Sequence, residues 1–340
     1  MDYVQLGRSG CRVSRFCLGT GNAKQPDHEE LWTQMVGEAL DAGINFVDTA
    51  NVYSKGVAES VLGSVLAANG WRDDVVLATK AVLKTGDGPN DQGASRYHLV
   101  RAVEDSLRRL KTDRIDLLYM HVVDRTTPVD ETLETLDTLV RQGKVLYVGT
   151  SKWPASLIME GLGIAQARGL PRFVAEQPPY QILDRGVENE LLWMARRHGV
   201  GVCVWGPLGY GLLSGKYRKG GEIPDGGRWT TENVAGSDRF TEEALDAVEA
   251  LIPLAEAHGI TLAQFAHAWL LTRPGITSVL IGPRTIEHLR STLASYDVEL
   301  SAEDLARVDE INPPGQWISN FYDGQVYRPL RNSLAEPMTG

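Results

Sequence analysis

The chain has 340 residues and a formal net charge of −10, with 43% hydrophobic and 23% charged residues, as in an ordinary globular protein. This negative charge disfavours nucleic acid and anionic membranes as the main partners, because neither attracts an acidic protein. The three cysteines form no CxxC motif, no stretch has the pattern of a secretory leader, and no apolar run reaches the roughly 18 residues of a membrane span. We therefore expect a cytoplasmic protein without a disulfide framework.

The first expected elements are a short hairpin that turns at Ser9-Gly10 and a strand over 15–18. After them, short apolar runs alternate with segments of helical periodicity. Further strands are expected at 44–48, 75–80, 115–121, 144–151, 172–177, 200–206 and 276–282. Helices are expected at 28–43, 58–70, 96–110, 128–143, 154–169, 187–199, twice within 241–273, and at 286–295. The expected helix ends carry Gly43, Gly70, Gly143, Gly169, Gly199 and Gly259.

This alternation predicts an α/β protein, with a (β/α)8 TIM barrel favoured over a doubly wound sheet. Continuous apolar strands indicate burial on both faces, as in a parallel sheet covered by helices. Eight strand–helix units without a linker favour one closed barrel domain over residues 1–340. A Gly/Pro-rich loop at 206–240 and an extra helix lengthen one connection. The C-terminal tail, 312–340, has neither helical nor strand periodicity, but its aromatic residues predict packing near the barrel mouth.

Four polar residues lie at the ends of expected strands or in the loops that follow: Asp48, Tyr53, Lys80 and His121. In a (β/α)8 barrel the carboxyl ends of the strands form the active-site rim, so these side chains are expected to meet there. Taken singly, each has an ordinary interpretation: a capping aspartate, a packed tyrosine, an exposed lysine or a hydrogen-bonded core histidine. Their joint placement at successive strand ends favours a functional site.

This set of side chains can donate a proton to a carbonyl oxygen while a hydride reaches the carbon. The ordinary pKa of tyrosine, about 10, is too high for rapid proton exchange near neutral pH. An adjacent ammonium lowers that pKa by stabilising the phenolate, and a buried aspartate keeps the lysine charged. A histidine can orient the carbonyl oxygen with a hydrogen bond.

Other motifs fail on inspection. Gly19-Thr20-Gly21 looks like the start of a dinucleotide-binding fingerprint, but Lys24 stands at the third glycine position. The segment GYGLLSGKY lacks the spacing of a phosphate-binding P-loop. No spacing of His, Cys, Asp or Glu in the sequence indicates a metal site.

Stretches along most of the chain resemble the aldo-keto reductase superfamily, in that family's order. They are LGT (18–20), AGINFVDTANVYSKGVAESVLG (42–63), VVLATK (75–80), SLRRLKTDRIDLLYMH (106–121), GKVLYVGTS (143–151), EQPPY (176–180), WGPLGYGLLSGKY (205–217) and LIGPRTIEHL (280–289). The resemblance, to bacterial members near the potassium-channel β-subunit and ketosugar reductase branches, implies that Tyr53 is the general acid. It also implies that Lys80 and Asp48 tune Tyr53, and that His121 orients the substrate.

The resemblance also implies cofactor contacts from Gly19, Thr20, Asp48, Ser151, Gln177, Trp205, Pro207, Leu208, Ser214, Lys216, Gly282, Arg284 and His288. Ser151 and Gln177 would hold the nicotinamide carboxamide, and Trp205 would stack on the ring. An arginine at a helix N-terminus suits a phosphate dianion, so Arg284 favours NADPH over NADH. Substrate contacts are expected from Asn22, Tyr53, His121 and Trp153, with Asn51 and Lys84 as further contributors.

Three departures from the family pattern accompany this resemblance. Lys152 stands where the family usually has asparagine, and Ser54 stands where it usually has glycine. Ser291-Thr292 replace a Glu-Asn pair that in the family contacts the adenine amino group. The sequence thus predicts an NADPH-dependent reductase of an aldehyde or ketone, with a ketosugar or other hydroxylated carbonyl as the substrate hypothesis and no metal requirement. The alternative is a regulatory subunit that binds NADPH and turns over slowly.

Overall fold

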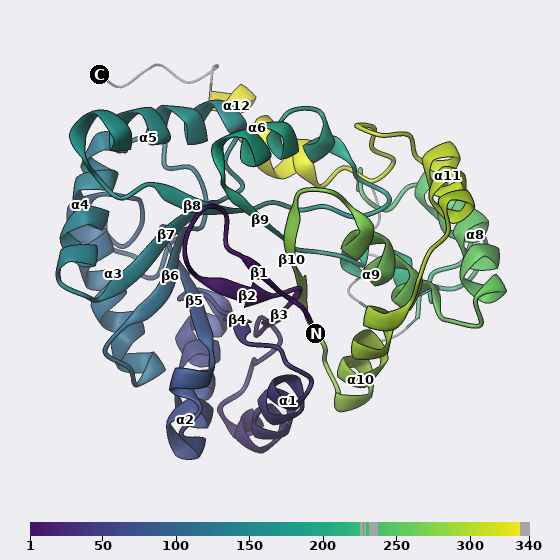
Figure 1. The fold of residues 1–340 in the computed structure, drawn as a ribbon, viewed down its shortest axis with the longest axis horizontal. Coiled ribbons are helices and arrows are strands. Elements are labelled where there is room, and N and C mark those ends of the chain that lie inside the picture. The colour runs from purple at the N-terminus through teal and green to yellow at the C-terminus, as the bar shows by residue number, and fades with distance from the viewer. Residues whose placement is uncertain (225–226, 228, 231–236, 334–340) are drawn as a thin grey trace.

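The protein, seen in a computed structural model that describes residues 1–224, 227, 229–230 and 237–333, is built around a closed barrel of parallel strands (Figure 1). The strands are β3 (Phe16–Gly19), β4 (Phe46–Asp48), β5 (Val76–Ala81), β6 (Ile115–Met120), β7 (Val145–Ser151), β8 (Phe173–Gln177), β9 (Gly201–Val204) and β10 (Ile276–Ile281). They follow one another around the barrel, and β10 pairs with both β9 and β3 to close it. The predicted (β/α)8 barrel is confirmed.

Helices surround the barrel (Figure 1). They are α1 (Glu29–Asp41), α2 (Val57–Asn69), α3 (Arg96–Leu110), α4 (Val129–Arg141), α5 (Ala155–Arg168), α6 (Leu191–His198), α8 (Glu242–Ala257), α9 (Leu262–Thr272), α10 (Ile286–Ala294), α11 (Ala302–Ile311) and α12 (Arg328–Ser333). The glycines expected at helix ends all have a positive φ. No helix was predicted over the residues of α11, although Ser301 and Asp304 form a capping box at its start.

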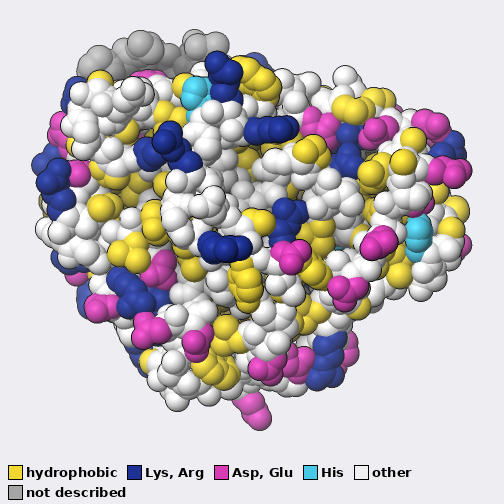
Figure 2. Space-filling model, in the orientation of Figure 1, with side chains coloured by type: hydrophobic (Ala, Val, Ile, Leu, Met, Phe, Trp, Pro, Cys, Tyr) yellow, Lys and Arg dark blue, Asp and Glu magenta, His cyan; other side chains and the backbone are white. Residues whose placement is uncertain are grey.

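The predicted N-terminal hairpin lies across one end of the barrel (Figure 1). Its strands β1 (Tyr3–Gln5) and β2 (Arg12–Ser14) pair antiparallel, and Leu6 and Val13 are buried. These two residues pack with the side chains that fill the barrel interior, among them Phe46 and Leu117. The interior is therefore a packed core, closed at the amino ends of the strands, and the functional rim is left to the carboxyl ends. Basic and acidic side chains are interspersed on the hairpin face (Figure 2).

The described part of the tail contacts Asp184 in the segment after β8, and the absence of helix predicted for the tail was wrong. A short π-helical turn, η7 (Asp323–Tyr327), leads directly into α12. Phe321 and Tyr322 are buried, whereas Trp317 remains 51% exposed. The backbone N–H groups of Phe321 and Tyr322 donate to the buried Asp184 carboxylate, at 2.6 and 2.5 Å. Residues 334–340 of the predicted tail lie outside the described residues.

None of the helices in the described part of the chain is both long and apolar enough to cross a membrane. The Gly/Pro-rich loop begins with the 3-10 turn η5 (Gly209–Ser214), and residues 225–226, 228 and 231–236 of that loop lie outside the described residues. After the loop, α8 and α9 occupy the region where two helices were predicted.

Candidate active site

The four predicted catalytic side chains converge at the carboxyl end of the barrel. Asp48 is the last residue of β4, Lys80 the last but one of β5, and His121 follows β6 directly. Tyr53 lies in the 3-10 turn η2 (Tyr53–Gly56) after β4. The Lys80 ammonium donates hydrogen bonds to the Asp48 carboxylate, to the Tyr53 hydroxyl at 3.2 Å, and to the Thr49 carbonyl at 2.8 Å. The rings of Tyr53 and His121 meet edge to face, 5.9 Å between centroids.

Lys80 and Asp48 form a buried ion pair, and each side chain is only 1% exposed. Burial alone lowers the pKa of Lys80, but Asp48 and Tyr53 together outweigh it, so the pKa of Lys80 is raised overall. Gln177 donates from Nε2 to the second oxygen of Asp48 at 2.9 Å. The lysine therefore remains a cation at neutral pH, and the aspartate has a second partner that fixes its orientation.

Burial shifts the pKa values of Tyr53 and His121 in opposite directions. It raises the pKa of Tyr53 above its ordinary value, and the Lys80 ammonium opposes this increase. The effect predicted for the lysine is present, but it does not lower the pKa of the tyrosine overall. Burial, followed by the charges of Lys80 and Lys152, holds the pKa of His121 well below its usual range. His121 is thus neutral at neutral pH, and its buried Nδ1 has no partner among the described residues.

The residues predicted to hold the nicotinamide lie beside the ion pair. Ser151 and Gln177 are register partners at the ends of β7 and β8, and the Ser151 hydroxyl donates to the Gln177 carbonyl at 2.9 Å. Trp205 follows β9, and its indole stacks on the ring of Tyr210 with 6.1 Å between centroids. Tyr210 in turn meets Phe321 of the tail at 5.0 Å. Tyr210 and Phe321 were not predicted beside Trp205, because only the folded chain brings residues 210 and 321 together.

The loops predicted to hold the rest of the dinucleotide follow β9 and β10. Pro207 is buried, Leu208 is partly buried, and Ser214 donates to the Gly211 carbonyl at 2.6 Å. The ammonium of Lys216 lies 4.9 Å from the centre of the Tyr217 ring.

At the other loop, Asn22 joins two strand ends, because its amide donates to the Gly282 carbonyl at 2.9 Å. Arg284 is exposed just before α10, where Thr285 caps the backbone N–H of His288.

These residues suit a nicotinamide dinucleotide. Several buried polar atoms at the rim have no partner among the described residues: Thr20 Oγ1, the Asn51 amide and His121 Nδ1. A side chain at Gly206 would meet no atom within 4 Å, and at Gly282 only the Asn22 amide, so both positions leave room for a ligand. Gly19 ends β3 directly before Thr20, whose backbone N–H donates to the Asp48 carbonyl at 2.9 Å. Within the described residues, no group of three or more His, Cys, Asp or Glu could hold a metal ion.

The remaining predicted substrate contacts differ in their surroundings. Trp153 is buried and packs edge to face on Phe173, 5.5 Å away, between the barrel wall and the helices. Asn51 is buried next to the tetrad, and its backbone N–H donates to the Lys80 carbonyl at 3.2 Å. Lys84 is exposed and forms an ion pair with Asp87 at 2.9 Å. Substrate roles for these residues and for Asn22 stay predictions.

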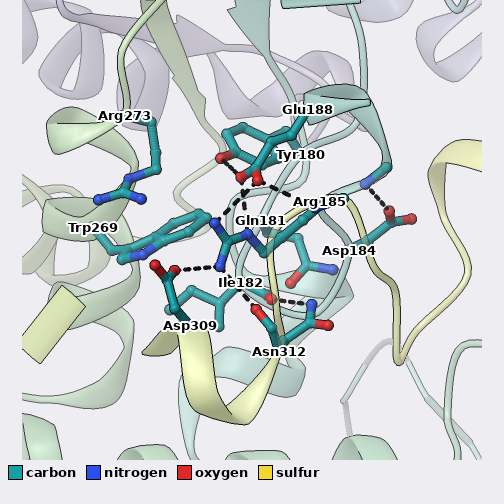
Figure 3. A network of polar contacts seen from close by, with 12 residues as sticks. Tyr180, Gln181, Ile182, Asp184, Arg185, Glu188, Trp269, Arg273, Asp309 and Asn312 are labelled. Carbon is teal, nitrogen blue, oxygen red and sulfur yellow. Dashed lines mark hydrogen bonds and ion pairs between the residues drawn. The ribbon is translucent and has the colours of Figure 1, made fainter. Parts of the chain in front are cut away.

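A second polar network braces the loop that follows β8 (Figure 3). Arg185 is buried and forms ion pairs with Glu188 at 2.9 Å and Asp309 at 2.6 Å. It also donates to the Asn312 carbonyl at 2.8 Å, and its guanidinium lies over the Trp269 ring at 5.4 Å. The network ties the end of α11 to the segment directly after Gln177, and so supports one wall of the site.

Comparison with known proteins agrees with this geometry. Residues 15–313 match the aldo/keto reductase family. The chain is 40% identical over 325 residues to the uncharacterized oxidoreductase YrpG of Bacillus subtilis (strain 168), covering 93% of this chain and 97% of that protein. It is 38% identical over 306 residues to probable voltage-gated potassium channel subunits beta of Arabidopsis thaliana and of Oryza sativa subsp. japonica, covering 88% of this chain and 92% of each relative. The chain therefore belongs to the aldo/keto reductase family and is an NAD(P)-dependent oxidoreductase.

Proposed function

We propose that the protein reduces an aldehyde or ketone to the alcohol with NADPH, and that Tyr53 supplies the proton. One observation carries the proposal: the buried Lys80 ammonium contacts both the Asp48 carboxylate and the Tyr53 hydroxyl. A lysine in this position stabilises the phenolate that remains after Tyr53 gives up its proton. When bound, the reduced nicotinamide supplies the hydride.

The other steps of the proposed reaction depend on the side chains of the tetrad. Tyr53 donates its hydroxyl proton to the carbonyl oxygen as negative charge develops there, and recovers a proton from solvent after the reaction. Asp48 keeps Lys80 charged in a buried place, where an unpaired ammonium would lose its proton. His121 is neutral, so its imidazole can donate one hydrogen bond to the same oxygen and fix the orientation of the carbonyl.

The preference for NADPH rests on the start of α10. Arg284 lies directly before Thr285, the N-cap of α10, and the first turn of a helix offers N–H groups to a phosphate. An arginine adds charge-assisted hydrogen bonds to the 2′-phosphate, which NADH lacks. Ser214, Lys216 and the backbone at Pro207–Leu208 are the proposed contacts of the pyrophosphate.

Replacement of Tyr53 tests the proposed acid. We expect Tyr53→Phe to lower kcat by about 10²–10⁴-fold, because general acid catalysis contributes that much. The Kd for NADPH, measured by fluorescence titration, should stay close to that of the wild type. Tyr97→Phe removes the hydroxyl of an exposed tyrosine on α3 and should change neither quantity. A loss of NADPH affinity equal to the loss of turnover would show that Tyr53 serves binding and not proton transfer.

The second candidate is a regulatory subunit that binds NADPH and turns over slowly. The similarity to the two probable potassium channel subunits beta favours it. Slow turnover of every carbonyl tested, together with a stable protein partner in pull-down, would support this function. Rapid turnover of one carbonyl class that depends on Tyr53 would exclude it.

A further inference from the structure

A cavity of about 270 Å³ opens near the amino ends of the strands, at the end of the barrel away from the tetrad. It lies between the turn of the hairpin, β7 and the segment that leads into β8. Its apolar wall consists of Leu146, Tyr147, Val148, Pro171 and Val174. An engineered apolar cavity of about 150 Å³ can hold benzene, so this cavity has room for a ring and a small polar group.

Two arginines also line this cavity, Arg8 from the hairpin turn and Arg172 from the segment before β8. Both are fixed at the turn between α6 and β9. The guanidinium of Arg172 donates to the His198 carbonyl, and the backbone N–H of Arg8 donates to the Gly199 carbonyl at 2.9 Å. The side chain of Arg8 lies against Gly199, because a Cβ added there would stand 2.9–3.0 Å from three of its carbons. The consecutive residues 198 and 199 therefore hold the two cations close together.

No carboxylate of the described residues balances these two charges. Neither guanidinium forms an ion pair within the part of the chain that the structure describes. The carboxylates of Asp116 on β6 and Glu104 on α3 are paired with other cations. The last turn of α6, which ends beside the two arginines, adds Arg196 and Arg197. The surroundings of the cavity are thus basic, although the whole chain is acidic.

Arg172 also has unused hydrogen-bonding capacity. Its Nε is buried and has no partner among the described residues. Burial, followed by the charge of Arg8, lowers the pKa of Arg172, as expected for two like charges in a partly buried place. An anion between the two guanidiniums would offset their repulsion and accept hydrogen bonds from both.

We propose that this cavity binds a small carboxylate with an apolar, ring-sized body, at a site separate from the active site. The carboxylate would lie between Arg8 and Arg172, since a guanidinium binds a carboxylate through two parallel hydrogen bonds. The apolar body would cover Leu146, which is 44% exposed, and Pro171 beside it in the cavity wall. Burial of this surface supplies affinity that a bare inorganic anion does not gain.

Calorimetry with benzoate tests the site, because benzoate carries both parts of the proposed ligand. We expect benzoate to bind the wild type more tightly than benzamide, which lacks the charge, and more tightly than inorganic phosphate, which lacks the ring. Arg8→Gln and Arg172→Gln should each raise the Kd of benzoate by about 10–100-fold, the range for hydrogen bonds between charged groups. The cofactor-free and the NADP⁺-loaded protein should give the same Kd, because the cavity lies at the opposite end of the barrel from the tetrad.

Arg12→Gln is the matched control. Arg12 lies on the same hairpin and is exposed, and its guanidinium donates to the Tyr3 carbonyl at 2.9 Å, outside the cavity wall. Its replacement removes the same charge and should leave the Kd of benzoate close to that of the wild type. A melting midpoint near that of the wild type shows that each variant is folded, and the exposed Arg8 supplies the test if Arg172→Gln is unstable.

Substitutions at Leu146 test the position of the ligand independently. Leu146→Glu places a carboxylate of the protein itself beside the two arginines and should abolish benzoate binding. Leu146→Gln has the same shape without the charge and should weaken binding only slightly. Both changes are at an exposed position of β7, and both variants should keep the turnover and the NADPH affinity of the wild type.

Three results would overturn the inference. The first is benzoate binding that is no tighter than the binding of benzamide or of inorganic phosphate. The second is a Kd of benzoate that neither arginine substitution changes. The third is binding to the NADP⁺-loaded protein alone, which would place benzoate at the active site. None of these results would count against the proposed reduction at Tyr53, which depends on the other end of the barrel.

Discussion

Replacing Arg185 should destabilise the protein strongly, because this cation holds several buried groups together. Arg185 is 2% exposed and pairs with Glu188 through two guanidinium nitrogens. It also binds Asp309 and the Asn312 carbonyl (Figure 3). Arg185→Met keeps much of the aliphatic stem over the Trp269 ring but leaves the Glu188 carboxylate without a cation, with the Tyr180 hydroxyl and the Gly315 backbone N–H as its remaining donors among the described residues.

The loss of stability in Arg185→Met depends on how far the charges left behind are buried. Removing one partner of a buried ion pair costs about 3–5 kcal/mol, since the other charge stays unpaired. The Glu188 side chain is 15% exposed and Asp309 is 41% exposed, so water compensates part of the loss. We therefore expect Arg185→Met to lower the free energy of unfolding by about 3 kcal/mol. Adding Glu188→Gln removes the unpaired charge and should recover about 1–2 kcal/mol.

Urea unfolding followed by tryptophan fluorescence measures these differences, provided that the slopes of the transitions agree. Arg307→Met is the matched control, because Arg307 pairs with Glu310 on the surface of α11 and both side chains are more than half exposed. That pair should contribute about 0–1 kcal/mol. The reasoning is refuted if Arg185→Met and Arg307→Met cost the same, or if the second substitution at Glu188 destabilises the protein further.

Two more predictions concern acid stability and the cofactor. Burial lowers the pKa of His267 to about 4, so the unfolded chain binds a proton that the folded chain does not between about pH 6.5 and pH 4. As the pH drops through that window, His267 should lower the free energy of unfolding by up to about 3 kcal/mol. The urea midpoint of His267→Leu should therefore fall less over the same pH range than the midpoint of the wild type. Arg284→Ala should raise the KM for NADPH about tenfold and leave that for NADH unchanged; an equal rise for both would place the arginine away from the 2′-phosphate.

Most of the barrel could be predicted because its signals are local. The buried strands appear as apolar runs and their helices as 3.6-residue patterns, and six of the helices are followed by a glycine with positive φ. Helix α11 was missed although its capping box is also a local signal. The tail was misjudged for a different reason: its backbone is fixed by Asp184, more than a hundred residues earlier in the chain.

The sequence by itself determined which chemical groups stand at the strand ends, and with them the fold class and the tetrad of Asp48, Tyr53, Lys80 and His121. Only the tertiary structure decided their protonation, because burial and the distances between charges have no local signature. Burial outweighs Lys80 in setting the pKa of Tyr53, and the nearby lysines help keep His121 neutral. The position of Lys152 beside that histidine likewise follows from the pairing of two strands, which no sequence window contains.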